Sequence, residues 1–293
     1  MNVRPITHED APVVAALARA DEEALRGRPS HVAADAVAAW WGRTDLANDS
    51  GLYEENGDVV AAGWFHVWGD IGSHVGIVAQ GAKGRGLGAS LVDRAEATAE
   101  QRGVPRVHAF ALGDDPAAAD LFRARGYREV RRFWEMAIDL GAEPAVPLLP
   151  EPLVLDEFRD GDERAFHHAT VESFQDHWEW HGPLFEEWWE MRRDNDHTLW
   201  FVVRDGDEIA AVARNEAREA SGYVGLLGVR RPWRGRGLAK ALLFRTFAEF
   251  WRRNLPRVTL EVDAASPTGA TKLYERVGMH VEAENVVFEK GAA

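Results

Sequence analysis

Hydrophobic and polar positions in the second half of the chain change their spacing along the sequence, and this change predicts a strand followed by a helix. Residues 223–229 form a short run of apolar residues and glycine, typical of a strand buried in a sheet. From residue 237 to about residue 251, apolar residues recur near helical spacing, with polar residues on the other side. Asn254 comes next, as Gly103 does in the first half, and both residue types tolerate the left-handed conformation that commonly ends a helix.

The pattern continues toward the end of the chain with a strand, a short helix and a closing strand. Residues 258–262 alternate between apolar and polar side chains, as a strand with one buried face does. Residues 270–276 have the pattern of a short helix, and Gly278 follows it. The closing strand is expected after that glycine.

Most of this pattern occurs twice, which indicates a duplication and decides the architecture. The segment KGRGLG at 83–88 matches RGRGLA at 234–239, 151 positions later. The segment RGVPRV at 102–107 matches RNLPRV at 253–258 with the same offset. A third block, offset by 152 positions, matches Leu121, Phe122 and Gly126 with Leu273, Tyr274 and Gly278.

The two copies are separated by a segment that has the composition of a semi-rigid linker. Residues 141–152 contain four prolines in twelve residues. A chain of 293 residues also exceeds the usual size of one compact core. We therefore predict an N-terminal domain over 1–140, a linker over 141–152 and a C-terminal domain over 153–293.

Composition and charge narrow the classes of function. The formal net charge of -14 argues against a nucleic-acid partner, because neutralising phosphates needs a basic stripe, and it favours a cationic or neutral small substrate. The absence of cysteine excludes a disulfide, a thiolate metal site and an acyl-cysteine intermediate. No apolar signal core or membrane-length apolar run is present, so we expect a cytoplasmic protein without a membrane partner.

The glycine-rich turn between the predicted strand and helix is a candidate anion site. Backbone N–H groups converge there, and the dipole of the following helix adds positive potential. A phosphate-bearing ligand is therefore implied. Neither copy has the six-residue glycine fingerprint with a later acidic residue that dinucleotide folds need, nor the Gly-Lys-Ser/Thr ending of the nucleotide P-loop.

At these residues the chain resembles the GNAT superfamily of N-acetyltransferases, whose pyrophosphate loop has the pattern Gln/Arg-x-x-Gly-x-Gly/Ala. Residues 234–239 fit this pattern fully, and residues 83–88 depart from it only at Lys83. FQDHW at 174–178 and LYERVGM at 273–279 resemble the tandem GNAT group that includes mycothiol synthase. The resemblance implies an α/β (α+β) fold of two tandem GNAT domains, each a mixed, mostly antiparallel sheet flanked by helices.

The resemblance also implies acetyl-CoA as the cosubstrate, with no metal. The positions it assigns to acetyl-CoA follow the motif in each copy. In the second copy they are Leu227, Gly228, Val229, Arg234, Gly235, Arg236, Gly237, Leu238 and Ala239, and in the first copy Val78, Lys83, Gly84, Arg85, Gly86, Leu87 and Gly88.

The second copy is the better candidate for catalysis. Acetyl transfer to an amine needs an oxyanion donor and a proton for the departing thiolate. The resemblance assigns the first role to backbone N–H near Val229 and the second to the tyrosine of the Leu-Tyr-Glu segment, Tyr274, whose phenol is protonated at neutral pH. The first copy has Phe122 at the corresponding position, so its domain is predicted to be catalytically degenerate.

The general base and the acceptor site remain open at the level of sequence. The strand at 223–229 carries no carboxylate, so Glu216, Glu261 or Asp263 could act through water, or a neutral amine could need no base. Carboxylates and tryptophans alternate over residues 172–189, which suits either a cationic amine acceptor or amphipathic helices with tryptophan in the core. His177 and His181 have the spacing of metal ligands on a helix, although hydrogen-bonded or surface histidines are favoured, and a basic cluster suits the phosphates of CoA: Arg230, Arg231, Arg234 and Arg236.

Two functions follow from these residues. The first is an acetyl-CoA-dependent N-acetyltransferase that acetylates the primary amine of a small molecule by direct attack, with no covalent enzyme intermediate. The alternative is a non-catalytic acyl-CoA-binding sensor, which Phe122 and the missing strand carboxylate favour. Release of CoA in the presence of an amine distinguishes the two.

Overall fold

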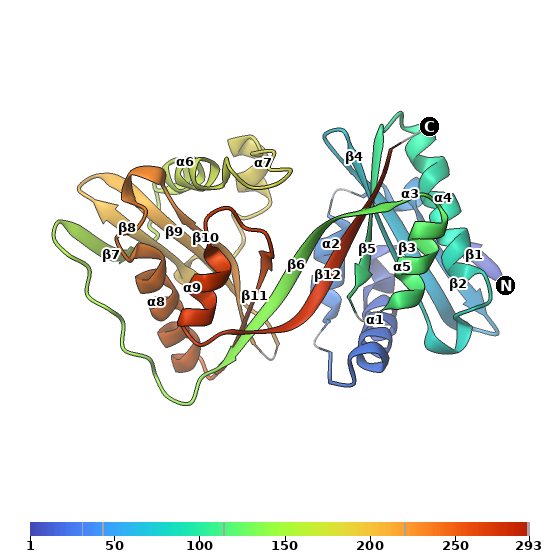
Figure 1. Ribbon diagram of the computed structural model, residues 1–293, viewed down its shortest axis with the longest axis horizontal. Helices are drawn as coiled ribbons and strands as arrows, with labels where there is room; N and C mark the ends of the chain where they lie inside the picture. The colour runs from blue at the N-terminus through green and yellow to red at the C-terminus, as the bar shows by residue number, and fades with distance from the viewer. Residues whose placement is uncertain (31, 43, 114, 220, 292–293) are drawn as a thin grey trace. The chain divides into compact units, whose positions relative to one another are not determined.

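The computed structural model describes residues 1–30, 32–42, 44–113, 115–219 and 221–291. The chain forms two compact units, and Figure 1 colours the chain from blue at the N-terminus to red at the C-terminus. The N-terminal unit consists of Met1–Phe133 together with Ala283–Ala293, and the C-terminal unit consists of Trp134–Glu282. We describe each unit by itself.

The N-terminal unit is a mixed sheet in the order β1-β2-β3-β4-β5-β12, with a parallel pair at β4 and β5. Buried side chains such as Trp41 and Trp64 pack helices against this sheet. The strands before β12 are β1 (Asn2–Arg4), β2 (Ser50–Glu55), β3 (Asp58–Trp68), β4 (Ile71–Val78) and β5 (Arg106–Leu112). The helices are α1 (Ala11–Arg26), α2 (Ala34–Trp41), α3 (Leu46–Asp49), α4 (Leu87–Gln101) and α5 (Pro116–Ala124), with 3-10 turns η1 (His8–Asp10) and η2 (Gln80–Ala82).

The C-terminal unit repeats this arrangement with the order β11-β10-β9-β8-β7 and a parallel pair at β10 and β11. Its strands are β7 (Leu153–Glu157), β8 (Trp200–Asp205), β9 (Glu208–Ala217), β10 (Gly222–Val229) and β11 (Arg257–Asp263). Its helices are α6 (Glu163–Phe174), α7 (Phe185–Glu190), α8 (Leu238–Arg252) and α9 (Ala270–Arg276), with 3-10 turns η3 (His197–Leu199) and η4 (Arg231–Trp233).

Each unit takes a strand from beyond the predicted linker. In β12 (His280–Gly291), residues 285–291 pair antiparallel with β5, and Phe288 lies in the core of the N-terminal unit. In β6 (Arg128–Asp139), Met136 lies in the core of the C-terminal unit, where β6 neighbours β11. This division differs from the predicted domains at 1–140 and 153–293. Strand pairing depends on residues that are far apart in the sequence, so the local composition of residues 141–152 does not indicate it.

The local predictions around the glycine turn are confirmed. The strand, the amphipathic helix, the next strand and the short helix are β10, α8, β11 and α9. Gly103 and Asn254 follow α4 and α8 with φ of 64° and 58°, in the left-handed region. Residues 141–152 contain neither helix nor strand.

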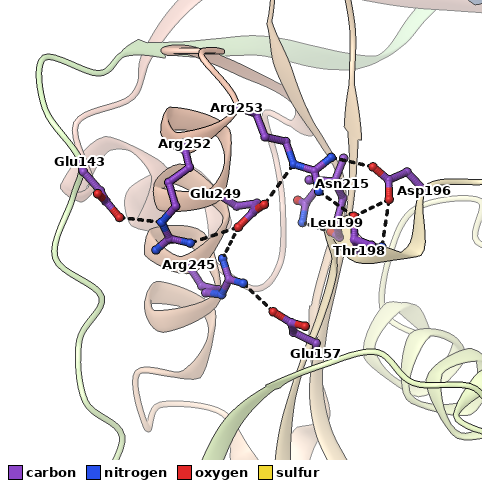
Figure 2. A network of polar contacts seen from close by, with 10 residues as sticks. All are labelled: Glu143, Glu157, Asp196, Thr198, Leu199, Asn215, Arg245, Glu249, Arg252 and Arg253. Atoms are coloured by element: carbon purple, nitrogen blue, oxygen red, sulfur yellow. Dashed lines mark hydrogen bonds and ion pairs between the residues drawn. The ribbon is translucent and has the colours of Figure 1, made fainter.

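A polar network holds the end of α8 to its surroundings in the C-terminal unit (Figure 2). Glu249 is at its centre and accepts hydrogen bonds from Arg245 at 2.8 Å, Arg252 at 3.1 Å and Arg253 at 3.0 Å. Each arginine also contacts a second carboxylate, which lies on another segment. Those carboxylates are Glu157 of β7, Glu143 of the linker and Asp196 before η3.

We expect Glu249→Gln to lower the free energy of unfolding by about 1–2 kcal/mol at pH 7, because three guanidiniums then lose a shared carboxylate. Burial raises the pKa of Glu249, but Arg245 and Arg253 together lower it below its ordinary value. A lowered pKa in the folded state stabilises the protein above the pKa of the unfolded state, and this contribution is lost as the pH falls. Urea denaturation at pH 7 and pH 3 measures both effects.

The matched control is Glu143→Gln, which removes a more exposed carboxylate from the same network. We expect its effect to stay below about 1 kcal/mol, as for surface ion pairs. An equal loss in both variants, or a Glu249→Gln effect that does not shrink at pH 3, contradicts the central role of Glu249.

Candidate functional site

The sheet of the C-terminal unit opens between β10 and β11. The two strands pair over Gly222–Val224 and Val258–Leu260. Beyond Val224, β10 pairs with β9 alone in the described part of the chain. One edge of β10 is therefore left without a neighbouring strand along residues 225–229.

Two of the predicted strand residues present their main chain to this opening. The N–H of Arg230 donates to Ala210 O on β9 at 3.0 Å. Residues along an antiparallel strand alternate in the direction of their N–H and C=O groups, so Leu227 and Val229 direct theirs away from β9. Both are positioned to donate to an oxyanion or to a ligand chain lying in the opening.

The third predicted residue, Gly228, has a packing role. A Cβ atom there would lie 2.8 Å from the Cβ of Ser173 on α6, whereas at Gly222 it would meet the ring of Phe250 on α8. Positions six residues apart in a regular strand share a face. Gly228 instead faces α6 and Gly222 faces α8, because β10 contains an additional residue between them.

That additional residue is Gly225, which forms a β-bulge. Val224 pairs with Asn215 and Leu226 with Arg214, so Gly225 has no residue opposite it. In the N-terminal unit, the register of β3 and β4 runs without a break from Ala61–Val78 to Trp68–Ile71. A bulge re-aims side chains next to it, and this device is present in β10 and absent from β4.

The glycine loop after β10 has the shape that an anion site needs. Gly235 and Gly237 have φ of 79° and 83°, a conformation that other residues adopt only with strain. No atom lies within 4 Å of the position that a Cβ would occupy on either residue, so the loop backbone is open to an approaching ligand. Gly237 is the N-cap residue immediately before α8, and Leu238 and Ala239 lie in the first turn, whose N–H groups and dipole favour a phosphate.

Three of the four arginines predicted to face CoA are bound to protein groups instead. Arg234 donates to Val229 O at 3.1 Å and to Ser173 O at 3.1 Å, which ties the loop to β10 and α6. Arg230 pairs with Glu172 at 2.6 Å, and Arg231 pairs with Asp176. Arg236 is exposed and has no carboxylate within 4.0 Å among the described residues, so it is the arginine available to a phosphate.

The loop of the N-terminal unit has the same backbone but different electrostatics. Gly84 and Gly86 are also left-handed, and Leu87 and Gly88 begin α4. Lys83 pairs with Asp21 at 2.7 Å and with Asp115 at 3.1 Å. Arg85, which corresponds to Arg236, pairs with Glu55 at 2.8 Å. Both predicted cations of this loop are thus neutralised within the unit.

Tyr274 lies on α9 in the core of the C-terminal unit, with 7 % of its surface exposed. Burial raises the pKa of its hydroxyl above the ordinary value, and neighbouring Tyr223 of β10 acts in the same direction. The hydroxyl therefore keeps its proton at neutral pH. The corresponding Phe122 packs against Tyr127 and Phe288 in the core of the N-terminal unit.

The three candidate bases differ in their surroundings. Glu216 pairs with Arg214 at 2.6 Å and is 38 % exposed. Asp263 is buried at the end of β11, where it accepts a hydrogen bond from the N–H of Ala265 at 2.9 Å. Glu261 is exposed on β11.

Several carboxylates of the segment at 172–189 are not available to a cationic amine acceptor. Glu172 and Asp176 are paired with arginines, and Glu186 pairs with Arg164 at 3.3 Å. Trp188 on α7 is 2 % exposed and packs in the core with Phe166 and Trp200. The helical-core interpretation is therefore the correct one for this tryptophan.

The histidine pair does not share a helix face, because α6 ends at Phe174. The His177 ring packs on Phe174 with 4.4 Å between centroids, and burial lowers its pKa. His181 Nδ1 donates to Glu179 O at 2.9 Å. Among the described residues no group of three or more potential metal ligands occurs, and no helix is long and apolar enough to cross a membrane.

Sequence reasoning missed two arginines: Arg214, which shares a sheet face with Tyr223, and Arg192, which lies near Arg214. Arg192 belongs to the charged run MRRDND, which is typical of a solvated surface. The one available signal was Gly225, because an isolated glycine inside a strand pattern suggests a bulge or a close approach.

Comparison with known proteins decides the family. The description "Acetyltransferase (GNAT) family" matches residues 15–127 and 156–279, which is one match in each copy. The chain belongs to the GNAT acetyltransferase family. It is therefore an N-acetyltransferase with tandem GNAT domains, and the predicted fold class is confirmed. A GNAT fold implies acetyl-CoA as cosubstrate and an acceptor for the acetyl group.

Several known proteins are similar to this GNAT protein over most of its length. A mycothiol acetyltransferase of Thermobispora bispora is 31 % identical over 93 % of both chains. The structure of a GCN5-related N-acetyltransferase from Sphaerobacter thermophilus is 33 % identical, with a TM-score of 0.87 over 99 % of this chain and 95 % of that one. A tandem GNAT protein from the clavulanic acid biosynthesis pathway shares the fold, with a TM-score of 0.76 and 16 % identity over 100 % and 98 % of the chains.

Proposed function

We propose that the C-terminal unit transfers acetyl from acetyl-CoA to the primary amine of a small molecule in a ternary complex. The observation that carries this proposal is the opening beside β10. The glycine loop at 234–239 follows the end of β10, and Tyr274 lies next to Tyr223 of the same strand. The described part of the N-terminal unit lacks three of these features. Phe122 replaces the tyrosine, β4 has no bulge against β3, and Arg85 is paired with Glu55. That unit is proposed to be catalytically degenerate.

The amine nitrogen attacks the thioester carbonyl, a C–N bond forms, and the C–S bond breaks. The N–H groups directed into the opening at Leu227 and Val229 stabilise the negative charge that develops on the carbonyl oxygen. Tyr274 gives its proton to the departing sulfur, and the proton lost by the amine restores the phenol through water or a carboxylate. No bond to a protein side chain forms at any step.

The loop residues hold acetyl-CoA through their backbone. The amides around Gly235 and Gly237 and the first turn of α8 bind the diphosphate, while Arg236 supplies a mobile positive charge. Arg234 positions the loop through its bonds to β10 and α6. The names of the relatives make an amine related to mycothiol one acceptor to test.

Acetyl-CoA titration by calorimetry and a thiol-release screen over a panel of amines test this function. We expect one acetyl-CoA bound per chain and release of CoA with at least one primary amine. Binding of two acetyl-CoA molecules with no turnover of any amine contradicts the proposal and favours an acyl-CoA sensor. No binding contradicts both.

A further inference from the structure

Arg192, two residues beyond the end of α7, is half-buried and has no carboxylate partner in the described part of the chain. Its Nε is buried and has no hydrogen-bond partner, while Nη1 donates to Trp188 O at 3.2 Å. Among the described residues no carboxylate lies within 4.0 Å of it. Burial, with nearby Arg214, lowers the pKa of Arg192 to about 10, although Glu216 opposes this shift. A partly buried guanidinium without an ion-pair partner is suited to pair with an anionic ligand, because the fold has already removed part of its hydration.

Arg214 lies at the bulge of β10. Its side chain is 14 % exposed, and Nη2 donates to the carbonyl oxygen of Gly225 at 3.4 Å. A Cβ on Gly225 would lie 3.3 Å from this Nη2 and 3.4 Å from Cζ, closer than most side chains tolerate. The glycine on β10 thus makes room for the guanidinium of Arg214, which comes from the neighbouring strand β9 and also pairs with Glu216 at 2.6 Å.

Arg214 shares a face of the sheet with Tyr223, and Arg192 lies close enough to Arg214 and Glu216 for their charges to act on it. Tyr223 stands opposite Glu216 in the register of β9 and β10, and the Arg218 guanidinium lies 3.4 Å from the centre of its ring. Tyr223 in turn lies close enough to Tyr274 to raise the pKa of its hydroxyl. Arg214 therefore lies on the face of the sheet that carries Tyr223, and Tyr223 is the neighbour of the proposed proton donor.

The local charge fits a single negative group. Three guanidiniums lie in this region: those of Arg214 and Arg218 act on Tyr223, and that of Arg192 lies close to Arg214 and Glu216. Two carboxylates, Glu216 and Glu261, face the same region. The excess of one positive charge suits a monoanion, and the planar fork of arginine matches a carboxylate in geometry. A dianionic phosphate would be opposed by the two carboxylates.

We propose that the acceptor is a primary amine that also carries a carboxylate, and that Arg192 and Arg214 bind this carboxylate beside the acetyl group. This inference rests on the proposed N-acetyltransferase function and names the class of its acceptor. It replaces the expectation of a purely cationic amine, whose attracting carboxylates, Glu172 and Asp176, are paired with arginines.

The test compares α-amino acids with their methyl esters and their decarboxylated amines in the thiol-release assay. We expect the wild type to prefer the free acids by at least about tenfold in kcat/KM. In Arg192→Gln, kcat/KM for the acids should fall about 10- to 100-fold, mainly through KM, as loss of a charged hydrogen bond predicts. The value for the esters should change less than about twofold.

Matched variants separate binding from folding. Arg193→Gln removes an adjacent exposed arginine that pairs with Glu190, and it should leave both substrate series unchanged. Arg192→Lys retains the charge without the fork and should give an intermediate loss, so the proposal stays testable if the glutamine variant fails to fold. Equal rates for acids and esters in the wild type, or equal losses for both in Arg192→Gln, overturn the proposal.

Direct binding distinguishes failure of this inference from failure of the proposed function. Calorimetry of an N-acetyl amino acid against its methyl ester requires no turnover. Carboxylate-dependent binding that Arg192→Gln abolishes supports the anion site even if no amine is acetylated. Acetylation of neutral amines without carboxylate-dependent binding supports the function and rejects the anion site.

Discussion

Tyr274→Phe should lower kcat for acetyl transfer by about 10²- to 10⁴-fold, the range of general acid catalysis. The substitution removes one hydroxyl and retains the ring, and a phenylalanine already occupies the corresponding buried position, Phe122, in the N-terminal unit. We therefore expect the fold and the acetyl-CoA Kd to be unchanged. Stopped-flow or steady-state thiol release, together with calorimetry, measures the two quantities separately.

The pH profile gives a second check on the same residue. Because burial raises the pKa of Tyr274, its neutral, proton-donating form persists above neutral pH. The wild-type kcat should therefore show no alkaline decline up to about pH 9, below the ordinary phenol pKa of about 10. The control is Tyr127→Phe, which removes a buried phenol from the N-terminal unit and should leave kcat unchanged. Similar losses in both variants would point to packing rather than proton transfer.

Gly237→Glu should weaken acetyl-CoA binding more than about 100-fold, or about 3 kcal/mol. Two effects combine. The residue has φ of 83°, which costs about 1–3 kcal/mol for a residue other than glycine. The new carboxylate also stands at the start of α8, where it competes with the CoA phosphates for the same N–H groups.

Gly86→Glu is the matched control for this loss. Gly86 has φ of 86° and begins α4 in the N-terminal unit, so the strain and the charge are the same. We expect its acetyl-CoA Kd to equal that of the wild type. Gly237→Ala separates strain from charge and should lose less than Gly237→Glu. A loss in Gly86→Glu as large as in Gly237→Glu would show that the N-terminal loop also holds the cosubstrate.

The fold could be predicted from sequence because the information is local and repeated. The glycine loops, the helices that follow them and the left-handed residues Gly103 and Asn254 each depend on a few neighbouring positions. The family followed from the same loops, and the contrast of Tyr274 with Phe122 from their alignment. These features can be recognised in the sequence without knowing which strands pair.

The parts that sequence could not supply depend on long-range contacts. Arg234 was assigned to phosphate, yet it is bound to Ser173, more than sixty residues earlier in the chain. Arg192 and Arg214 approach one site from two elements, and a charged run gives no sign of burial. The exchange of β12 depends on pairing with β5, which no local pattern of residues 141–152 encodes.

The exchanged strands bear on how the protein is made. On the ribosome, residues 1–133 emerge first, but the sheet they form gains β12 beside β5 only when residues 283–291 have been translated. The N-terminal unit can therefore complete its native sheet only after the whole C-terminal unit has been synthesised. A gene cut at the proline-rich linker would yield two fragments that each lack a strand, so the duplicated halves have become interdependent in folding.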